Sequence, residues 1–191
     1  MPKVNRTAYA ILGMLSFKPM SGYDMKKAFD ESVAHFWNEN YGHIYPVLKR
    51  LEHGGLVTKE TVSTQGKPSR YVYSITEKGT RHLVDWLLLP AERPTLRIEL
   101  LLKLFFGHLL PPQNLIEKIE EELKFCKQIL RRFDEIEQHV SEMRNKSEFQ
   151  GVRYGLISLR YGQHYYSAVQ DWCEETIDIL KKTENVEGGN T

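Results

Sequence analysis

The hydrophobic positions of the first 32 residues recur every three or four residues, which predicts two amphipathic helices. The first covers residues 6–17 and carries an apolar stripe made of Ala8, Ile11, Leu12 and Leu15. "KPMSG" then interrupts the pattern, and Ser21 followed three residues later by Asp24 matches a capping box. The second helix is therefore expected over about residues 22–32, with a buried face made of Met25, Ala28 and Phe29.

A third helix, a β-hairpin and a fourth helix are predicted before residue 90. Residues 41–57 keep a helical apolar rhythm that ends in two glycines. The spacing then changes to alternation in "LVTKETVS" and "RYVYSI", two predicted strands that flank the turn segment "TQGKPS". Thr76 can cap a helix ending in "VDWLLLP". This order predicts a mainly α protein whose residues 1–90 form a winged helix-turn-helix with a two-stranded β wing.

The second half of the chain is helical throughout in its pattern. Pro90 and Pro94 bracket a linker, and a short apolar helix is expected at about 95–109, before two further prolines. From residue 113 to about 145 the apolar positions alternate by three and four, close to a coiled-coil seam; they are Ile116, Ile119, Leu123, Cys126, Leu130, Phe133, Ile136, Val140 and Met143. A last helix is expected over about 152–181. We assign residues 91–182 to a helical dimerisation domain and 183–191 to a polar, disordered tail.

An apolar seam of this length must be covered by another apolar surface. In one interpretation, an antiparallel helical hairpin closes on itself within a single chain. In the other, which we favour, hairpins from two chains pack together as a two-fold dimer, because the apolar faces are too broad for a simple hairpin.

Charge changes this picture only slightly. The 191 residues carry a net charge of +1, but residues 1–90 hold 12 Lys and Arg against 8 Asp and Glu, while residues 91–191 hold 14 against 17. A mildly basic first half fits a module that binds a polyanion. An asymmetry of this size does not by itself select a function.

The two cysteines and the most apolar segment indicate where the protein works. Cys126 and Cys173 each lie in an apolar helical register, which predicts buried free thiols and a reducing compartment. "LRIELLLKLFFGHLL" is interrupted by Arg97, Glu99 and Lys103 and is too short to span a bilayer. The N-terminal segment has no cleavage pattern of a signal peptide. We therefore expect a soluble, cytoplasmic protein.

No catalytic or metal-binding pattern is found in the sequence. The seven histidines are scattered without metal-ligand spacing, and the chain contains no Gly-rich phosphate loop. The acidic run at residues 120–122 is interpreted as a solvated helix face. The sequence therefore predicts a protein that is not an enzyme and needs no cofactor or metal.

Residues 41–57 combine an apolar face with an opposite polar face of unusual composition. At about 100° per residue, Ile44, Val47, Leu48 and Leu51 share one narrow arc that can dock on the first two helices. Tyr45, Lys49 and His53 fall opposite, flanked by Pro46 and Arg50. Pro46 is expected in the opening turn, where it forfeits no helical hydrogen bond, and the glycines at 54 and 55 are expected to cap the helix in the left-handed conformation.

This polar face has two interpretations. It can be an ordinary solvated helix face, which would be favoured if the helix stood alone. It can also enter a DNA major groove, with the helix tip against base edges and Lys49 and Arg50 near phosphates. The third-helix position and the basic hairpin tip, where Lys67 and Arg70 can flank the minor groove, favour DNA binding.

These same segments resemble the PadR family of transcriptional regulators. The resemblance lies in "SGYDM", "GHIYPVLKRLEHGGLV" and "YVYSITEKG", and covers about residues 6–88. The helical second half is similar to the family's C-terminal dimerisation domain in length and order. Within the family, "HFWNEN" and "STQGK" look most like the phenolic-acid-responsive repressors.

The resemblance implies a dimeric repressor whose two winged domains bind double-stranded DNA at a palindromic operator. It implies recognition through Tyr45, Pro46 and Lys49, together with Lys67 at the hairpin tip. His43 is also among the expected DNA-binding residues. It departs from the family pattern, which often has Thr or Ser there, and it can hold a phosphate only when it donates a hydrogen bond.

The resemblance also implies release from DNA by a small aromatic or phenolic effector. Candidate effector-binding residues combine rings with positive or polar groups; they are Phe36, Trp37, Tyr154, Arg160 and His164. Each of these can instead be a core or dimer-interface residue. A different class of function, a helical module whose winged domain binds protein rather than DNA, is the alternative to the regulator.

Overall fold

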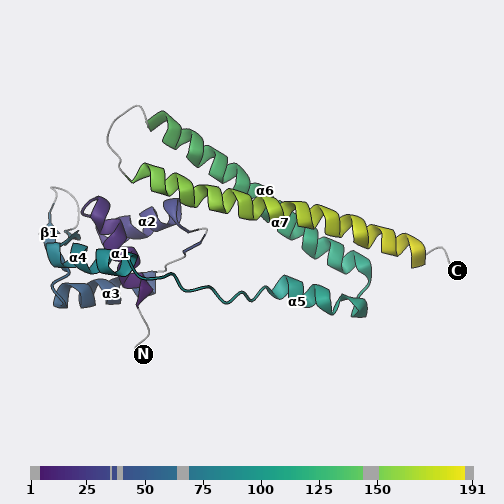
Figure 1. The fold of residues 1–191 in the computed structure, drawn as a ribbon, viewed down its shortest axis with the longest axis horizontal. Coiled ribbons are helices and arrows are strands. Elements are labelled where there is room, and N and C mark those ends of the chain that lie inside the picture. Colours follow the sequence, from purple (N-terminus) through teal and green to yellow (C-terminus); the bar gives the residue numbers. More distant parts are fainter. Residues whose placement is uncertain (1–4, 35, 38–40, 64–68, 144–150, 188–191) are drawn as a thin grey trace. The chain divides into compact units, whose positions relative to one another are not determined.

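The computed structural model describes residues 5–34, 36–37, 41–63, 69–143 and 151–187 (Figure 1). The chain divides into two compact units, Met1–Arg93 and Pro94–Thr191, three residues beyond the boundary predicted at residue 90. The elements in chain order are α1 (Arg6–Phe17), α2 (Gly22–Ser32), α3 (Tyr41–His53), β1 (Val57–Val62), β2 (Arg70–Ile75), α4 (Glu77–Leu87), α5 (Glu99–Phe105), the 3₁₀ turn η1 (Gly107–Leu109), α6 (Pro112–Met143) and α7 (Val152–Glu187).

The first unit has the element order of the predicted winged helix-turn-helix. β1 and β2 form an antiparallel hairpin in the register that places Val57 opposite Ile75. Met20, in the turn between α1 and α2, exchanges two backbone hydrogen bonds with Tyr73 of β2, at 3.1 and 3.0 Å. The helical turn and the wing are thus joined by a bridge that the hydrophobic pattern does not reveal.

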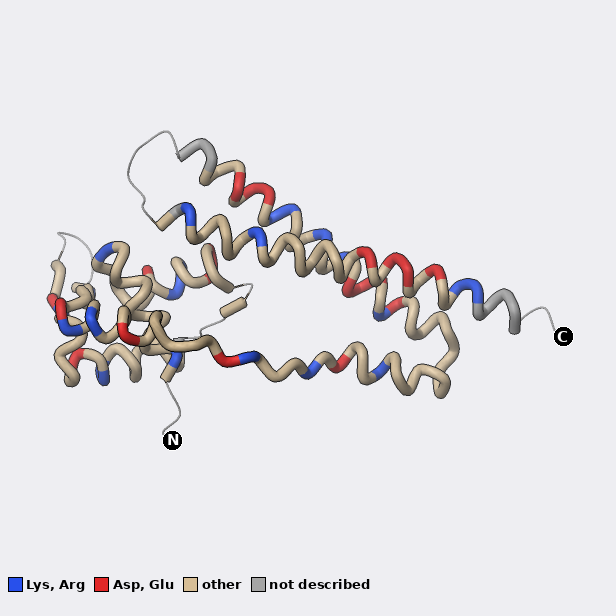
Figure 2. Tube along the Cα trace, in the orientation of Figure 1, with Lys and Arg blue, Asp and Glu red and all other residues tan. Residues whose placement is uncertain are grey.

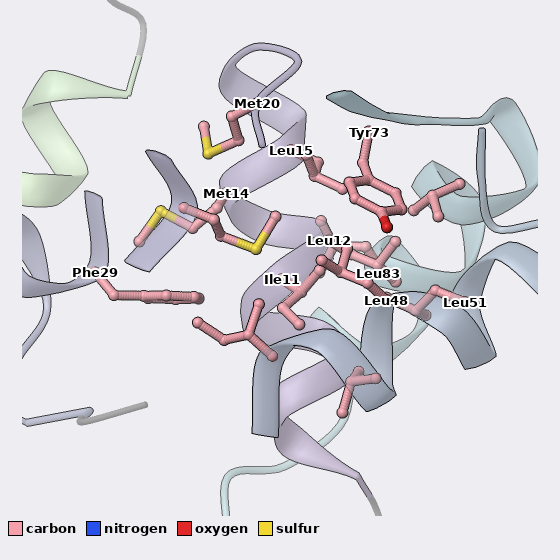
Figure 3. Packing of buried hydrophobic residues seen from close by; sticks show 14 residues of the cluster. Ile11, Leu12, Met14, Leu15, Met20, Phe29, Leu48, Leu51, Tyr73 and Leu83 are labelled. Carbon is pink, nitrogen blue, oxygen red and sulfur yellow. The ribbon is translucent and has the colours of Figure 1, made fainter. Parts of the chain in front are cut away.

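One hydrophobic core holds the first unit together (Figure 3). The apolar face predicted for α3 is buried as a whole, and Ile44 and Leu48 are fully inaccessible to solvent. The buried residues come from every element of the unit; they are Ile11, Leu12, Met14, Leu15, Met20, Met25, Phe29, Ile44, Val47, Leu48, Leu51, Val57, Tyr73 and Leu83. The predicted stripes are confirmed, except that Ala8 and Ala28 lie half-buried at the edge of the core.

The start of α2 is closed by the predicted capping box. The Asp24 N–H donates to Ser21 Oγ at 3.2 Å, and Asp24 Oδ2 accepts from the Ser21 N–H at 3.4 Å. The Ser21 hydroxyl also donates to Asp24 Oδ2, at 2.8 Å. Because Ser21 is itself buried, these bonds fix the first turn of α2 in one conformation.

The structure corrects the prediction for Pro46. Since α3 begins at Tyr41, Pro46 lies inside the helix and not in its first turn. Proline has no N–H, so the carbonyl of Gly42 loses the partner that a residue four positions later normally supplies. Gly42 is exposed, and water can bond that carbonyl instead.

The end of α3 has the predicted glycine cap. Gly55 has φ 67°, and its N–H donates to the Glu52 carbonyl at 2.9 Å. The Leu56 N–H donates to the Leu51 carbonyl, also at 2.9 Å, which completes a Schellman motif. A left-handed conformation favours glycine, so Gly55 sets the direction in which the chain enters β1.

The first turn of α4 is tied to this glycine cap. Thr76 accepts from the Gly79 N–H at 3.0 Å as N-cap of α4 and donates to the Gly55 carbonyl at 2.9 Å. Lys78 Nζ donates to the Gly54 carbonyl at 2.8 Å. At Gly79 an added Cβ would lie 2.1 Å from the Leu56 carbonyl oxygen, so only glycine permits this approach of the two backbones.

The second unit is a pair of long helices preceded by a short one. α5 covers Glu99–Phe105 and is followed by η1, so it is shorter than the helix predicted at 95–109. α6 and α7 run antiparallel: Lys127 Nζ lies 3.1 Å from Glu174 Oε1, while Gln163 Nε2 donates to Glu137 Oε2 at 3.0 Å. α7 continues to Glu187, beyond the predicted end at 181, so residues 183–187 are helical where a disordered tail was predicted.

The contact between α6 and α7 follows the predicted seam. Ile116, Ile119, Cys126 and Phe133 are buried, and the other described seam positions are half-buried. Both cysteines are buried free thiols, as predicted. Burial raises the pKa of Cys126 above its ordinary value and that of Cys173 to about 11. Across the described part of the chain, no helix combines the length and apolar character needed to cross a membrane.

The close contact between Gly79 of α4 and Leu56, just after α3, leads to a stability prediction. We expect Gly79→Ala to lower the free energy of unfolding by about 1–3 kcal/mol, because the new methyl group meets a backbone carbonyl that cannot move alone. Chemical denaturation measures the difference. Gly13→Ala is the matched control, since an added Cβ at that helical position meets nothing within 4 Å. Equal stability of the two variants would contradict the proposed role of Gly79.

Candidate nucleic-acid interface

The solvent side of α3 brings the predicted DNA-contacting side chains together. Burial of the opposite, apolar side in the core determines which side chains point outward. The exposed residues of the helix include all five predicted there, namely His43, Tyr45, Pro46, Lys49 and Arg50. A helix that offers an aromatic ring, a flat proline and two cations on one exposed side can contact base edges and phosphates of a duplex.

Tyr45 lies at the border between this exposed side and α2. Its side chain is 50% exposed, and its ring lies against Gly22, the first residue of α2. An added Cβ on Gly22 would lie 2.7 Å from Tyr45 Cε1 and 2.9 Å from Cζ. The ring therefore rests on the backbone of α2, a contact that the helical pattern of α3 alone does not predict.

The wing is connected to the same end of α2. Arg70 Nη1 of β2 donates to Asp24 Oδ2 at 3.3 Å, while the Arg70 side chain remains 59% exposed. Hydrogen bonds from Ser21, together with the charges of Arg70 and Lys18, lower the pKa of Asp24 below its ordinary value. Arg70 thus links the wing to the first turn of α2 through a largely exposed ion pair. Lys67, the other residue predicted in the wing, lies outside the described residues.

Other exposed aromatic and basic side chains near these elements were not among the predicted site residues. Lys59 of β1 lies 4.0 Å from Glu52 of α3, and its Nζ lies 4.1 Å from the ring centre of Tyr71 on β2. Tyr23, next to Gly22, is 63% exposed. Alternation along β1 and β2 would not have identified Lys59 and Tyr71, because Lys59 shares a face with the buried Val57 and Tyr71 shares one with the buried Tyr73.

The predicted effector residues of the first unit lie after α2. Phe36 is half exposed, and Trp37 lines a cavity of about 380 Å³. Trp86 also lines this cavity and stacks on Tyr9 with ring centres 4.6 Å apart. The described residues that line it are Arg6, Trp37, Trp86, Leu87, Leu89, Pro90, Ala91 and Glu92, and Arg6 forms an ion pair with Glu92.

The predicted effector residues of the second unit are exposed on α7. Tyr154 is 71% exposed, His164 is exposed, and Arg160 Nη2 lies 3.9 Å from Glu137 Oε1 of α6. None of the three is among the described residues that line an apolar cavity of about 360 Å³ in this unit; these are Ile98, Leu100, Leu101, Glu122, Tyr165, Ala168, Val169 and Trp172. Glu122, predicted to be solvated, is half-buried there.

The long helix α6 carries charges of both signs. Acidic residues recur along α6, as Figure 2 shows, and alternate with basic residues in the same helix. Among the described residues, no group of three or more His, Cys, Asp or Glu side chains is placed to hold a metal ion.

Comparisons with known sequences identify two matching families. Residues 11–85 match the transcriptional regulator PadR-like family, and residues 96–181 match a family described as "Virulence activator alpha C-term". The negative transcriptional regulator PadR of Bacillus subtilis is 34% identical over 117 residues, which are 61% of this chain and 64% of that protein. The aligned part thus covers less than two thirds of that relative's length.

Solved structures match over nearly the whole chain. The crystal structure of Bacillus subtilis PadR in complex with operator DNA has a TM-score of 0.82 at 26% identity, covering 93% of this chain and 99% of that chain. The crystal structure of the same protein in complex with p-coumaric acid has a TM-score of 0.71 at 24% identity, covering 95% and 99%. At that identity the second likeness concerns the fold.

Proposed function

Because the chain belongs to the PadR-like family of transcriptional regulators, we propose that it binds operator DNA in a sequence-specific manner and regulates transcription. The observation that carries this proposal is the exposed side of α3, held outward by a fully buried opposite side. A relative with this fold has been solved with its operator DNA. As a DNA-binding protein with two buried free thiols, which fit a reducing compartment, it would act in the cytoplasm of its cell.

In the proposed complex, α3 enters the major groove. Tyr45 and Pro46 would contact base edges and thymine methyl groups, while Lys49 and Arg50 would contact phosphates. His43, in the first turn of α3, would bind a phosphate, since a helix N-terminus attracts anions. Lys67 and the exposed side of Arg70 would contact the backbone beside the adjacent minor groove.

We propose a homodimer that binds a palindromic operator. The second unit exposes large apolar side chains along α5 and η1: Phe105 is 79% exposed, Leu109 74% and Leu102 60%. An exposed apolar surface of this kind marks a protein–protein contact, and a two-fold dimer buries it on both chains at once. Two copies of α3 about 34 Å apart would then meet successive major grooves.

The proposed regulator represses transcription and is released by a small aromatic effector. The cavity beside Trp37 supports this part, because it combines two indole rings with the guanidinium of Arg6. The carboxylate of an aromatic acid could replace Glu92 as the partner of Arg6, while its ring lies against the tryptophans. Bacillus subtilis PadR, the relative solved with p-coumaric acid, indicates which compound to test first.

DNA binding is tested with Lys49→Ala and a duplex that the wild-type protein selects from a random pool. We expect weaker binding and a smaller salt dependence, with the slope of log K against log salt reduced by about 0.9 for each phosphate that is no longer neutralised. Fluorescence anisotropy at several salt concentrations measures both. Lys124→Ala, an exposed lysine of α6, removes the same charge elsewhere and should bind as wild type. If Lys49→Ala binds as tightly as Lys124→Ala, α3 is not the DNA-contacting helix. A wild-type protein that selects no duplex would instead favour a protein-binding module.

Dimer formation is tested with Phe105→Glu. A carboxylate in place of a ring at the proposed contact should convert a micromolar solution from dimer to monomer, because the charge would be buried without a partner. Sedimentation velocity measures the mass. Gln128→Glu adds the same charge at an exposed position of α6 and should remain dimeric. A wild-type monomer, or a dimer that Phe105→Glu leaves intact, would exclude this contact.

Effector binding is tested by titrating p-coumaric acid and following tryptophan fluorescence. We expect Arg6→Ala to weaken binding about tenfold or more, since a charge-assisted hydrogen bond is worth roughly 1.5–3 kcal/mol. Arg81→Ala, which removes the surface ion pair with Glu77, is the control. Unchanged affinity in Arg6→Ala would place the effector site elsewhere.

A further inference from the structure

The contact between Gly22 and Tyr45 gives the first residue of α2 a role beyond helix formation. Three atoms at the far end of the Tyr45 side chain lie close to the missing Cβ of Gly22, at 2.7 Å (Cε1), 2.9 Å (Cζ) and 3.1 Å (Oη). These separations are shorter than the van der Waals contact of any side chain placed there. The ring therefore occupies the space that a side chain at position 22 would take.

Gly22 is a rigid support for this ring. The residue is buried, and the Met25 N–H donates to the Ser21 carbonyl at 2.9 Å to begin the helix. The capping box between Ser21 and Asp24 closes the same turn, and Arg70 of the wing adds a bond to Asp24. Hydrogen bonds thus hold the residues before and after Gly22 in place, whereas the Tyr45 side chain can change its rotamer.

We propose that Gly22 is a positioning residue for DNA recognition, because it holds Tyr45 in the orientation that reads the groove. The proposal rests on the DNA-binding function proposed above. An aromatic side chain that is half exposed on a helix loses rotamer freedom when it binds, which lowers affinity. Because the ring already packs against the α2 backbone, much of this rotamer freedom is given up on folding, and the remaining loss on binding DNA lowers the affinity less.

The same contact predicts how Gly22→Ala changes the protein. The atoms that clash belong to the far end of a flexible side chain, so the Tyr45 ring swings away while the backbone stays in place. Alanine is also a better helix residue than glycine, which favours an intact α2. The variant should therefore fold as wild type and differ in the orientation of one ring.

The experiment is a double-mutant cycle on the duplex selected by the wild-type protein. We expect Gly22→Ala to weaken binding about tenfold, close to the effect of Tyr45→Ala, as for removal of one base contact. In the Tyr45→Ala background, Gly22→Ala should have no further effect, because the ring it displaces is gone. Gly13→Ala, where an added Cβ has open space, should bind as wild type.

A readout without DNA separates this proposal from the proposed function. In NMR spectra with labelled tyrosine rings, Tyr45 signals are assigned by their disappearance in Tyr45→Ala, and they should shift in Gly22→Ala while the thermal midpoint does not fall. Unshifted ring signals would overturn the positioning role, as would equal weakening of DNA binding by Gly22→Ala with and without Tyr45. If the wild-type protein selects no duplex, the DNA-binding function fails, and the ring shift still tests the contact.

Discussion

Burial of one side of α3 is the interaction on which the proposed function of the first unit depends. Burying a large aliphatic side chain contributes roughly 1.5–3 kcal/mol, and Ile44, Val47, Leu48 and Leu51 are all buried. Exposed ion pairs contribute about 0–1 kcal/mol each, so pairs such as Lys59 with Glu52 cannot orient the helix against this preference. The charged side faces outward because the apolar side is held inward.

Polar and backbone contacts then fix the positions of the elements around α3. The glycine cap at Gly55 aims the chain into β1, and the close approach at Gly79 joins the start of α4 to that cap. At the other end of the helix, Gly22 supports Tyr45, while Asp24 holds Arg70 of the wing. Motif residues that carry the family resemblance thus determine backbone geometry in addition to the DNA contacts proposed for some of them.

The second unit uses apolar surface in two ways. Along α6 and α7 the seam packs within one chain, and burial raises the pKa values of the two thiols. Along α5 and η1 large apolar side chains remain exposed in the single chain. The sequence left two alternatives for covering the seam, a hairpin closed within one chain and a dimer of hairpins. The structure packs α6 against α7 within one chain, and the proposed dimer uses the exposed surface of α5 and η1 instead.

Local patterns determined the element order, the caps at Ser21, Thr76 and Gly55, and the inward and outward sides of α3, because each depends on residues close together in sequence. Only the tertiary structure decided which residues of different elements contact one another. The sequence assigned Pro46 to the first turn, since a helix start without a clear cap leaves no local signal. The seat of Tyr45 on Gly22, the bond from Arg70 to Asp24 and the cavity beside Trp37 join residues from different elements, whose proximity arises only when the core packs.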